Sequence, residues 1–149
     1  MIQSPYEGAL KFLGIKEVPG SVANPQILAM LRLDQAWPDD DKVPWCSAFM
    51  NYVCWFCGVE RSKSLRARSW LRVGRPITEI DAVKGFDVVI LSRGGGVQPG
   101  ADVINAPGHV GFFSAMDRDK IVLLGGNQND TVKFSDYTIS RVLGIRRLS

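Results

Sequence analysis

The chain has 149 residues, of which 46% are hydrophobic and 22% are charged, and its formal net charge is +3 at pH 7. This length predicts one domain over residues 1–149, because two domains would each be too short to bury a sizeable core. The charge excess is small and no basic stripe is interleaved with aromatic residues, which argues against nucleic-acid binding. No apolar run reaches the length of a membrane span.

Two short helices are expected in the first part of the chain. A Ser-Pro pair at 4–5 predicts a capped helix that ends near Gly14, and an Asn-Pro pair at 24–25 predicts a second helix to about Leu33. Apolar residues recur in both segments at helical spacing.

A longer helix is predicted from Cys46 to about Gly58, because its apolar residues recur every three or four positions. A cysteine in the first turn lies near unpaired backbone N–H groups and the positive end of the helix dipole. Both favour the thiolate, which is the nucleophilic form. Cys46 is therefore the candidate nucleophile. A further helix or helical turn is expected over 64–74.

The second half of the chain is rich in β-branched and apolar residues. Strands are predicted over 87–91, 108–115, 120–125 and 141–146, with a short strand at 131–134. Helices followed by antiparallel strands predict an α+β fold. The glycine-rich segment 93–107 lacks the Gly-Lys-Ser/Thr ending of a phosphate loop, and we expect it to form one wall of a groove.

The single histidine, His109, is the candidate base, and it lies at the start of a predicted strand. The next strand ends in amides, of which Asn127 is the expected partner of the imidazole, with Gln128 and Asn129 as alternatives. The order Cys, His, Asn is that of papain-like thiol sites. Cys46, His109 and Asn127 are thus the candidate catalytic residues.

Metal sites have little support. Cys54 and Cys57 lie one turn apart, but no second cysteine pair exists and the histidine is otherwise assigned, so buried, inert thiols are favoured over zinc or redox use. The aspartates at 39–41 suggest calcium, yet adjacent carboxylates cannot all face one ion. A solvated turn is favoured; the alternative is that one aspartate caps the cysteine helix or lines the groove. We expect no metal and no cofactor.

Four motifs resemble the CHAP and NlpC/P60 superfamily, and more narrowly its small phage-endolysin-like branch. They are Pro44–Phe49, Ala67–Leu71, Gly108–Phe112 and Leu124–Gln128. The resemblance extends over about residues 5–146. It implies a papain-like fold, with the cysteine helix packed on a small antiparallel sheet.

The resemblance also implies a function: a peptidoglycan hydrolase that cuts an amide bond through a thioester on Cys46. Such an enzyme is either an endopeptidase or an N-acetylmuramoyl-L-alanine amidase. Trp45, Arg68 and Gln128 lie in the motifs and are candidate substrate-binding residues, although an ion pair would explain Arg68 equally well. Some relatives carry a glutamate where this chain has Gly125, a departure that bears on the third catalytic residue.

Two other functions use the same features. An acyltransferase or transglutaminase-like enzyme would share the thiol chemistry and differ in its acceptor. A non-catalytic wall-binding module would keep the fold, although the presence of both Cys46 and His109 counts against it.

The expected partner is peptidoglycan, and the expected state is a monomer. The first residues lack the basic and then apolar pattern of a signal peptide. We therefore expect synthesis in the cytoplasm and action on the cell wall, reached by lysis, with a holin partner, or through a secretion machine.

Overall fold

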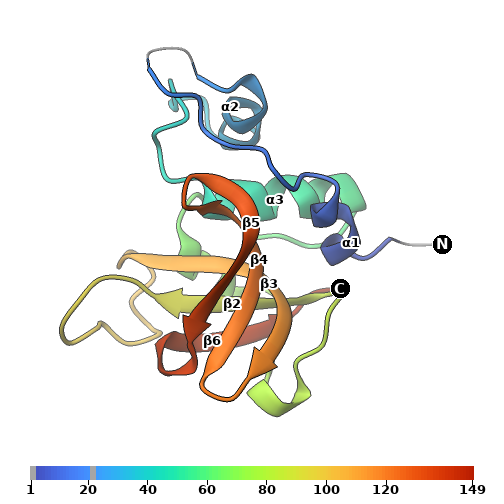
Figure 1. The fold of residues 1–149 in the computed structure, drawn as a ribbon, viewed down its shortest axis with the longest axis vertical. Coiled ribbons are helices and arrows are strands. Elements are labelled where there is room, and N and C mark those ends of the chain that lie inside the picture. Colours follow the sequence, from blue (N-terminus) through green and yellow to red (C-terminus); the bar gives the residue numbers. More distant parts are fainter. Residues whose placement is uncertain (1–2, 21–22) are drawn as a thin grey trace.

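A computed structural model describes residues 3–20 and 23–149 of the chain. The α-helices are α1 (Pro5–Leu10), α2 (Pro25–Leu31) and α3 (Cys46–Cys57), and the 3₁₀ helices are η1 (Ala67–Arg72), η2 (Glu79–Asp81) and η3 (Ile139–Arg141). The strands are β1 (Arg75–Ile77), β2 (Asp87–Ser92), β3 (Gly108–Asp117), β4 (Lys120–Gln128), β5 (Thr131–Thr138) and β6 (Val142–Arg147). The α-helices gather at one end and the sheet lies at the other (Figure 1).

The described strands form one antiparallel sheet in the order β1-β6-β2-β3-β4-β5. The α+β prediction is therefore confirmed. The edge strand β1 is not among the predicted strands, because its residues carry no strand pattern and it forms only by pairing with β6. The strand expected at 131–134 continues to Thr138 because its whole length pairs with β4.

The caps of the first two helices are as predicted. The Ser4 hydroxyl accepts from the Glu7 N–H, and the Asn24 side chain accepts from the Gln26 N–H. The first helix is shorter than expected, because the chain leaves the α-helix after Leu10 and continues in tight turns. Of the helix or helical turn predicted over 64–74, only the short 3₁₀ helix η1 forms.

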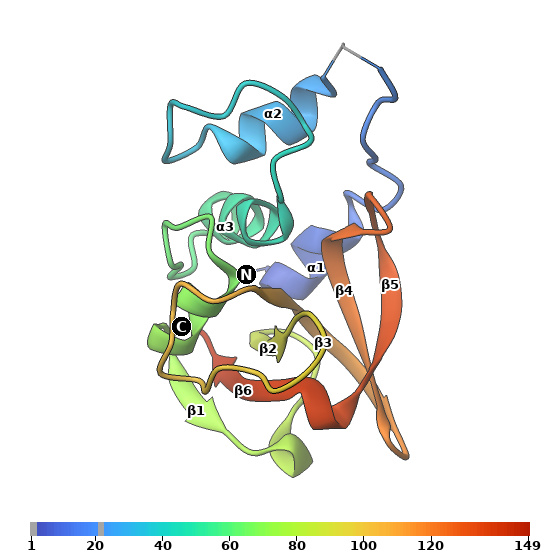
Figure 2. The same cartoon turned by 90° about the vertical axis from the view of Figure 1, so that its left-hand side faces the viewer.

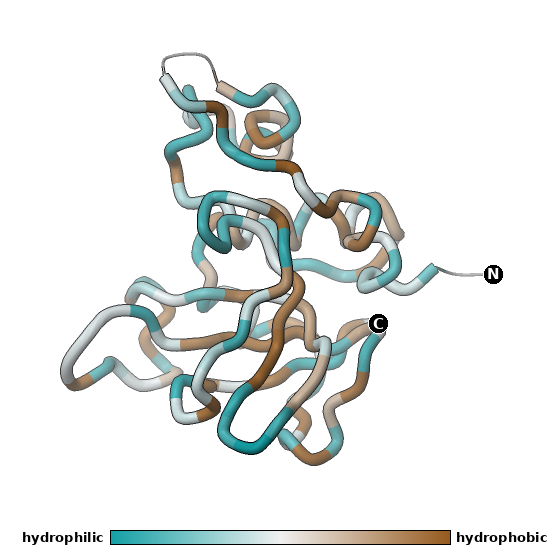
Figure 3. The backbone as a smooth tube through the Cα atoms, viewed as in Figure 1, coloured by the Kyte–Doolittle hydropathy of each residue, from teal (hydrophilic) through white to brown (hydrophobic). Residues whose placement is uncertain are grey.

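Helix α3 lies between α2 and the sheet (Figure 2). Its residues Phe49, Met50 and Val53 are fully buried and join one core with Phe112 and Leu124 of the sheet. Apolar residues line β3 and β4 where these strands pass under the helix (Figure 3). Burial of each such side chain contributes roughly 1.5–3 kcal/mol, which anchors α3 and with it the position of Cys46.

A second core occupies the opposite face of the sheet, as the alternation of side chains along a strand requires. Its buried members are Val89, Leu91, Phe113, Ile121, Leu123 and Ile145. Ile77 near one edge and Tyr137 at the other both pack against it, so the sheet curls around this cluster.

A glycine lets the start of α3 approach β4 closely. A Cβ atom on Gly126 would lie 2.7 Å from Phe49 Cβ and 2.7 Å from Trp45 Cζ3, closer than van der Waals contact allows. Gly126 therefore sets the separation between the cysteine helix and the strand that ends in the amides. Among the described helices, none is long and apolar enough to cross a membrane.

Candidate active site

Cys46 is the first residue of α3, and its side chain is almost fully buried. The preceding residue, Trp45, provides no side-chain cap, so no side chain occupies the N–H groups of the first turn. The backbone N–H groups of Val110 and Ser47 lie near enough to the thiol to lower its pKa. The sulfur therefore lies against β3, next to the residue that follows His109.

His109 is the second residue of β3 and is also almost fully buried. Its Nε2 lies 2.9 Å from the side-chain oxygen of Gln128. The amide nitrogen of Gln128 donates to the carbonyl oxygens of Leu123 (3.2 Å) and Lys133 (2.6 Å). Because both hydrogens of the amide are engaged, its oxygen must face the imidazole and accept. Nε2 thus carries the proton, and the lone pair of Nδ1 is left as the base.

The expected partner of the imidazole, Asn127, is replaced in the structure by its neighbour Gln128. Between Gly125 and Gln128, β4 contains one residue more than β5, and Asn127 adopts a left-handed conformation with φ 56°. This bulge turns Gln128 toward His109. Gly125 makes room for it, because a Cβ there would lie 2.9 Å from the Gln128 oxygen.

The ionisation of the pair is set mainly by burial. Burial raises the pKa of the Cys46 thiol, although the N–H groups of Val110 and Ser47 oppose this shift. Burial lowers the pKa of His109 to about 4; the Gln128 hydrogen bond raises it, and the positive charges of Arg93 and Arg141 lower it further. At neutral pH the resting site holds a thiol and a neutral imidazole. The thiolate expected from the helix start is thus outweighed by desolvation.

Tyr137 and Arg141 complete the surroundings of the histidine. The ring centroids of Tyr137 and His109 are 5.3 Å apart, and the Arg141 guanidinium lies 5.1 Å from the Tyr137 centroid. Arg141 also donates from Nε and Nη2 to the Ser92 carbonyl oxygen. This stack limits rotation of the imidazole. Neither residue is predicted from the sequence; the position of Tyr137 depends on the β4–β5 register.

The three residues that were expected to bind substrate make other contacts in the structure. Trp45 is fully buried and donates from Nε1 to a Glu17 carboxylate oxygen at 3.0 Å. Gln128 is engaged with His109. Arg68 is fully buried, and among the described residues it forms no ion pair. Neither substrate contact nor an ion pair accounts for Arg68.

Arg68 holds the segment that precedes His109. Its guanidinium donates to the carbonyl oxygens of Pro99, Gly100, Val103 and Pro107. These carbonyls belong to the long connection between β2 and β3. Arg68 is therefore a positioning residue for that loop and for the start of β3.

Cys46 lines an open pocket of about 360 Å³. The other lining residues are Pro44, Leu65, Arg66, Ala67, Arg93, Asn105, Ala106, Pro107 and Gly108. Both ends of the β2–β3 connection contribute, so this segment forms a wall of the groove, as the sequence predicted.

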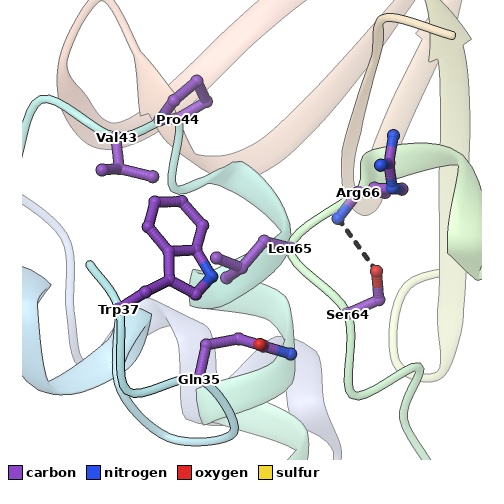
Figure 4. A pocket seen from close by; sticks show the side chains of 7 residues that line it. All are labelled: Gln35, Trp37, Val43, Pro44, Ser64, Leu65 and Arg66. Carbon is purple, nitrogen blue, oxygen red and sulfur yellow. Dashed lines mark hydrogen bonds between the residues drawn. The ribbon is translucent and has the colours of Figure 1, made fainter. Parts of the chain in front are cut away.

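A second pocket, of about 400 Å³, adjoins the first and shares Pro44, Leu65 and Arg66 with it (Figure 4). The indole of Trp37 lies across this pocket between Pro44 and Leu65 in Figure 4, and 60% of the residue is exposed. Gln35 and Ser64 add polar groups to its lining. The two pockets together make a groove that leads from Trp37 to Cys46.

The described residues contain no group of three or more His, Cys, Asp or Glu side chains arranged to hold a metal ion. Asp41 is buried and accepts from the N–H groups of Val18 and Asn24, both at 2.9 Å. It thereby ties the loop before Cys46 to Asn24, the residue that caps α2, whereas the expected aspartate cap of the cysteine helix does not form, because no side chain caps α3. Cys54 and Cys57 carry free thiols, the first buried and the second half-buried.

No family model matches the chain. No curated protein matches it either. Among solved structures, it is similar to NlpC1 from Trichomonas vaginalis, with 17% sequence identity and a TM-score of 0.56. The alignment covers 97% of this chain and 43% of that one, so the chain spans less than half of its neighbour's length. At this identity the likeness shows the fold alone: an α+β fold of the NlpC type, consistent with the papain-like expectation.

Proposed function

We propose that the chain is a cysteine peptidase or amidase that cuts an amide bond of peptidoglycan, in the manner of NlpC/P60 and CHAP hydrolases. The observation that carries the proposal is the amide of Gln128, which fixes the tautomer of His109 so that Nδ1 serves as a base. The Cys46 thiol lies near the same strand, where the N–H group of the next residue, Val110, lowers its pKa. An inert buried cysteine and histidine would not need this arrangement.

The reaction begins with attack of the Cys46 sulfur on the carbonyl carbon of the amide. His109 removes the thiol proton as the S–C bond forms, because the resting pKa values leave both groups neutral. The C–N bond then breaks, and the imidazolium gives its proton to the leaving amine. A thioester remains on Cys46, and water activated by His109 hydrolyses it to a carboxylic acid and the free thiol.

The developing oxyanion needs hydrogen-bond donors. The uncapped first turn of α3 supplies them, with the Cys46 N–H best placed since it belongs to the nucleophile itself. No acidic side chain lies in this turn, so the positive end of the helix dipole is not offset.

The shape of the site supports a polymeric substrate. The groove is open and extends from the sulfur past Arg66 to Trp37, which suits an extended chain better than a small molecule. Peptidoglycan is the polymer that the sequence motifs imply. We extend the proposal to a phage-endolysin-like enzyme acting on the wall after release from the cytoplasm.

The test is digestion of purified peptidoglycan, with the soluble fragments identified by mass spectrometry. The wild type should release fragments whose masses name the bond, and Cys46→Ala should release none. Cys54→Ala removes another buried thiol of the same helix and should retain activity, which makes it the matched control. Release by folded Cys46→Ala protein would refute the proposal. Products heavier by an added amine would show transfer instead of hydrolysis.

A further inference from the structure

Two arginines line the Cys46 pocket, and a third lies near His109. Arg66 and Arg93 line it together with the cysteine, and Arg141 lies over Tyr137, which stacks on His109. Among the described residues, none of the three pairs with a carboxylate, because the arginine ion pairs found there involve Arg32, Arg61 and Arg147. No acidic residue lines the pocket either. The mouth of the site is therefore positively charged without an internal counterion.

The guanidinium groups keep donors for a ligand. Arg66 uses Nη1 for the Asn105 carbonyl oxygen at 3.3 Å, and Arg141 uses two donors on the Ser92 carbonyl oxygen. The Arg93 side chain makes no hydrogen bond to the described residues, and it is exposed. Its charge nevertheless reaches both members of the pair, since it lowers the pKa of Cys46 and of His109.

An arginine without a protein counterion that lines an open pocket suits a carboxylate, which it can bind through two parallel hydrogen bonds. We infer that the substrate is an acidic peptide whose free carboxylate lies beside the scissile amide and binds Arg93, assisted by Arg66. This inference rests on the proposed function and adds a recognition element to it.

Binding of the carboxylate would also change the basicity of His109. A negative charge at Arg93 offsets the positive charge that holds down the pKa of His109. The imidazole then becomes a stronger base only when the substrate is in place. Recognition and activation are coupled through one side chain.

The first experiment needs no peptidoglycan. Iodoacetate and iodoacetamide both alkylate a thiol with loss of iodide and a proton, but only iodoacetate is an anion. Rates at Cys46 are measured by peptide mapping, which separates this thiol from Cys54 and Cys57. Relative to a free cysteine peptide, wild-type Cys46 should favour iodoacetate, and the preference should fall as salt is added.

Variants locate the source of the preference. Arg93→Gln should lower the iodoacetate-to-iodoacetamide rate ratio by about 3- to 10-fold, and adding Arg66→Gln should lower it further. The control is Arg72→Gln, which removes an exposed arginine outside this pocket and should leave the ratio unchanged. A ratio that is the same in wild type and Arg93→Gln would overturn the inference.

The second experiment uses soluble peptidoglycan fragments, either native or with their carboxylates converted to carboxamides. For the wild type, amidation should lower kcat/KM by about 10-fold or more, and for Arg93→Gln it should have little further effect. Equal rates on both substrates, with activity that still requires Cys46, would overturn the carboxylate inference and leave the proposed function standing. Activity that does not require Cys46 would instead refute the function.

Discussion

The side-chain oxygen of Gln128 lies 2.9 Å from Nε2 of His109, while the nitrogen of the same amide is held by two backbone carbonyls. One residue therefore determines both the orientation and the tautomer of the imidazole. A carboxylate could accept from Nε2 as well, but it could not donate to the two carbonyls. An amide is the group that satisfies every contact of this position.

Truncation of Gln128 tests that relationship. Gln128→Ala should lower kcat by on the order of 10²-fold, because the imidazole loses its fixed tautomer and orientation. KM should change little, since the residue is buried away from the groove. Steady-state kinetics on soluble peptidoglycan fragments measure both.

Gln128→Glu separates orientation from packing. The glutamate still accepts from His109 but leaves the Leu123 and Lys133 carbonyls without donors, so unfolding free energy should fall by about 1–3 kcal/mol. Asn127→Ala is the control, because Asn127 does not contact the imidazole in this structure. A larger loss of kcat for Asn127→Ala than for Gln128→Ala would contradict the assignment.

The pH dependence follows from the pKa of His109, which is lowered to about 4. Only the neutral imidazole can accept the thiol proton. We therefore expect kcat/KM to stay constant from neutral pH to about pH 5 and to fall as the pH drops through about 4. Arg93→Gln removes a positive charge that disfavours the imidazolium, so it should raise the pKa of His109 and move the acid limb to higher pH. A shift toward lower pH, or no shift, would contradict the electrostatic account.

Arg68 is predicted to act through the loop that it holds. Arg68→Lys keeps the charge but cannot donate to four separate carbonyls, and the buried ammonium is left incompletely solvated. Unfolding free energy should fall by roughly 3–5 kcal/mol, as for other buried charges that lose partners. Denaturant unfolding measures the loss. Arg66→Lys, at a neighbouring exposed position, should lower the unfolding free energy far less. Equal losses for the two variants would argue against the positioning role of Arg68.

Trp37 tests whether the adjoining pocket belongs to the substrate groove. Because 60% of the residue is exposed, Trp37→Ala should leave the fold intact. If the indole packs against substrate, KM should rise several-fold while kcat changes little, as for loss of binding common to ground and transition states. Trp55→Ala is the matched control, since this tryptophan is also half exposed, near the other end of α3. Identical kinetics for the two variants would place Trp37 outside the groove.

Local signals were sufficient to predict the elements that carry the site. Two capped helices, a cysteine at a helix start and a histidine at a strand start all follow from residue type and spacing. What local signals lacked was the pairing register. The bulge that selects Gln128 over Asn127 is a property of the β4–β5 pair, and so is the position of Tyr137.

Burial was the other quantity that the pattern could not supply. A cysteine at a helix start predicts a lowered thiol pKa, yet packing against β3 desolvates Cys46 and reverses the direction. The same holds for Trp45 and Arg68, whose motif positions suggested substrate contact. Both side chains lie entirely inside the protein.

The most direct test of the account is to trap the covalent intermediate. Soluble peptidoglycan fragments are mixed with the protein, quenched in acid within milliseconds to seconds, and analysed by intact-protein mass spectrometry with peptide mapping. The account predicts an acyl adduct on Cys46 that turns over with time, is absent in Cys46→Ala and forms more slowly in Gln128→Ala. Fragment cleavage with no adduct on Cys46, or an adduct on Cys54 or Cys57 instead, would contradict it.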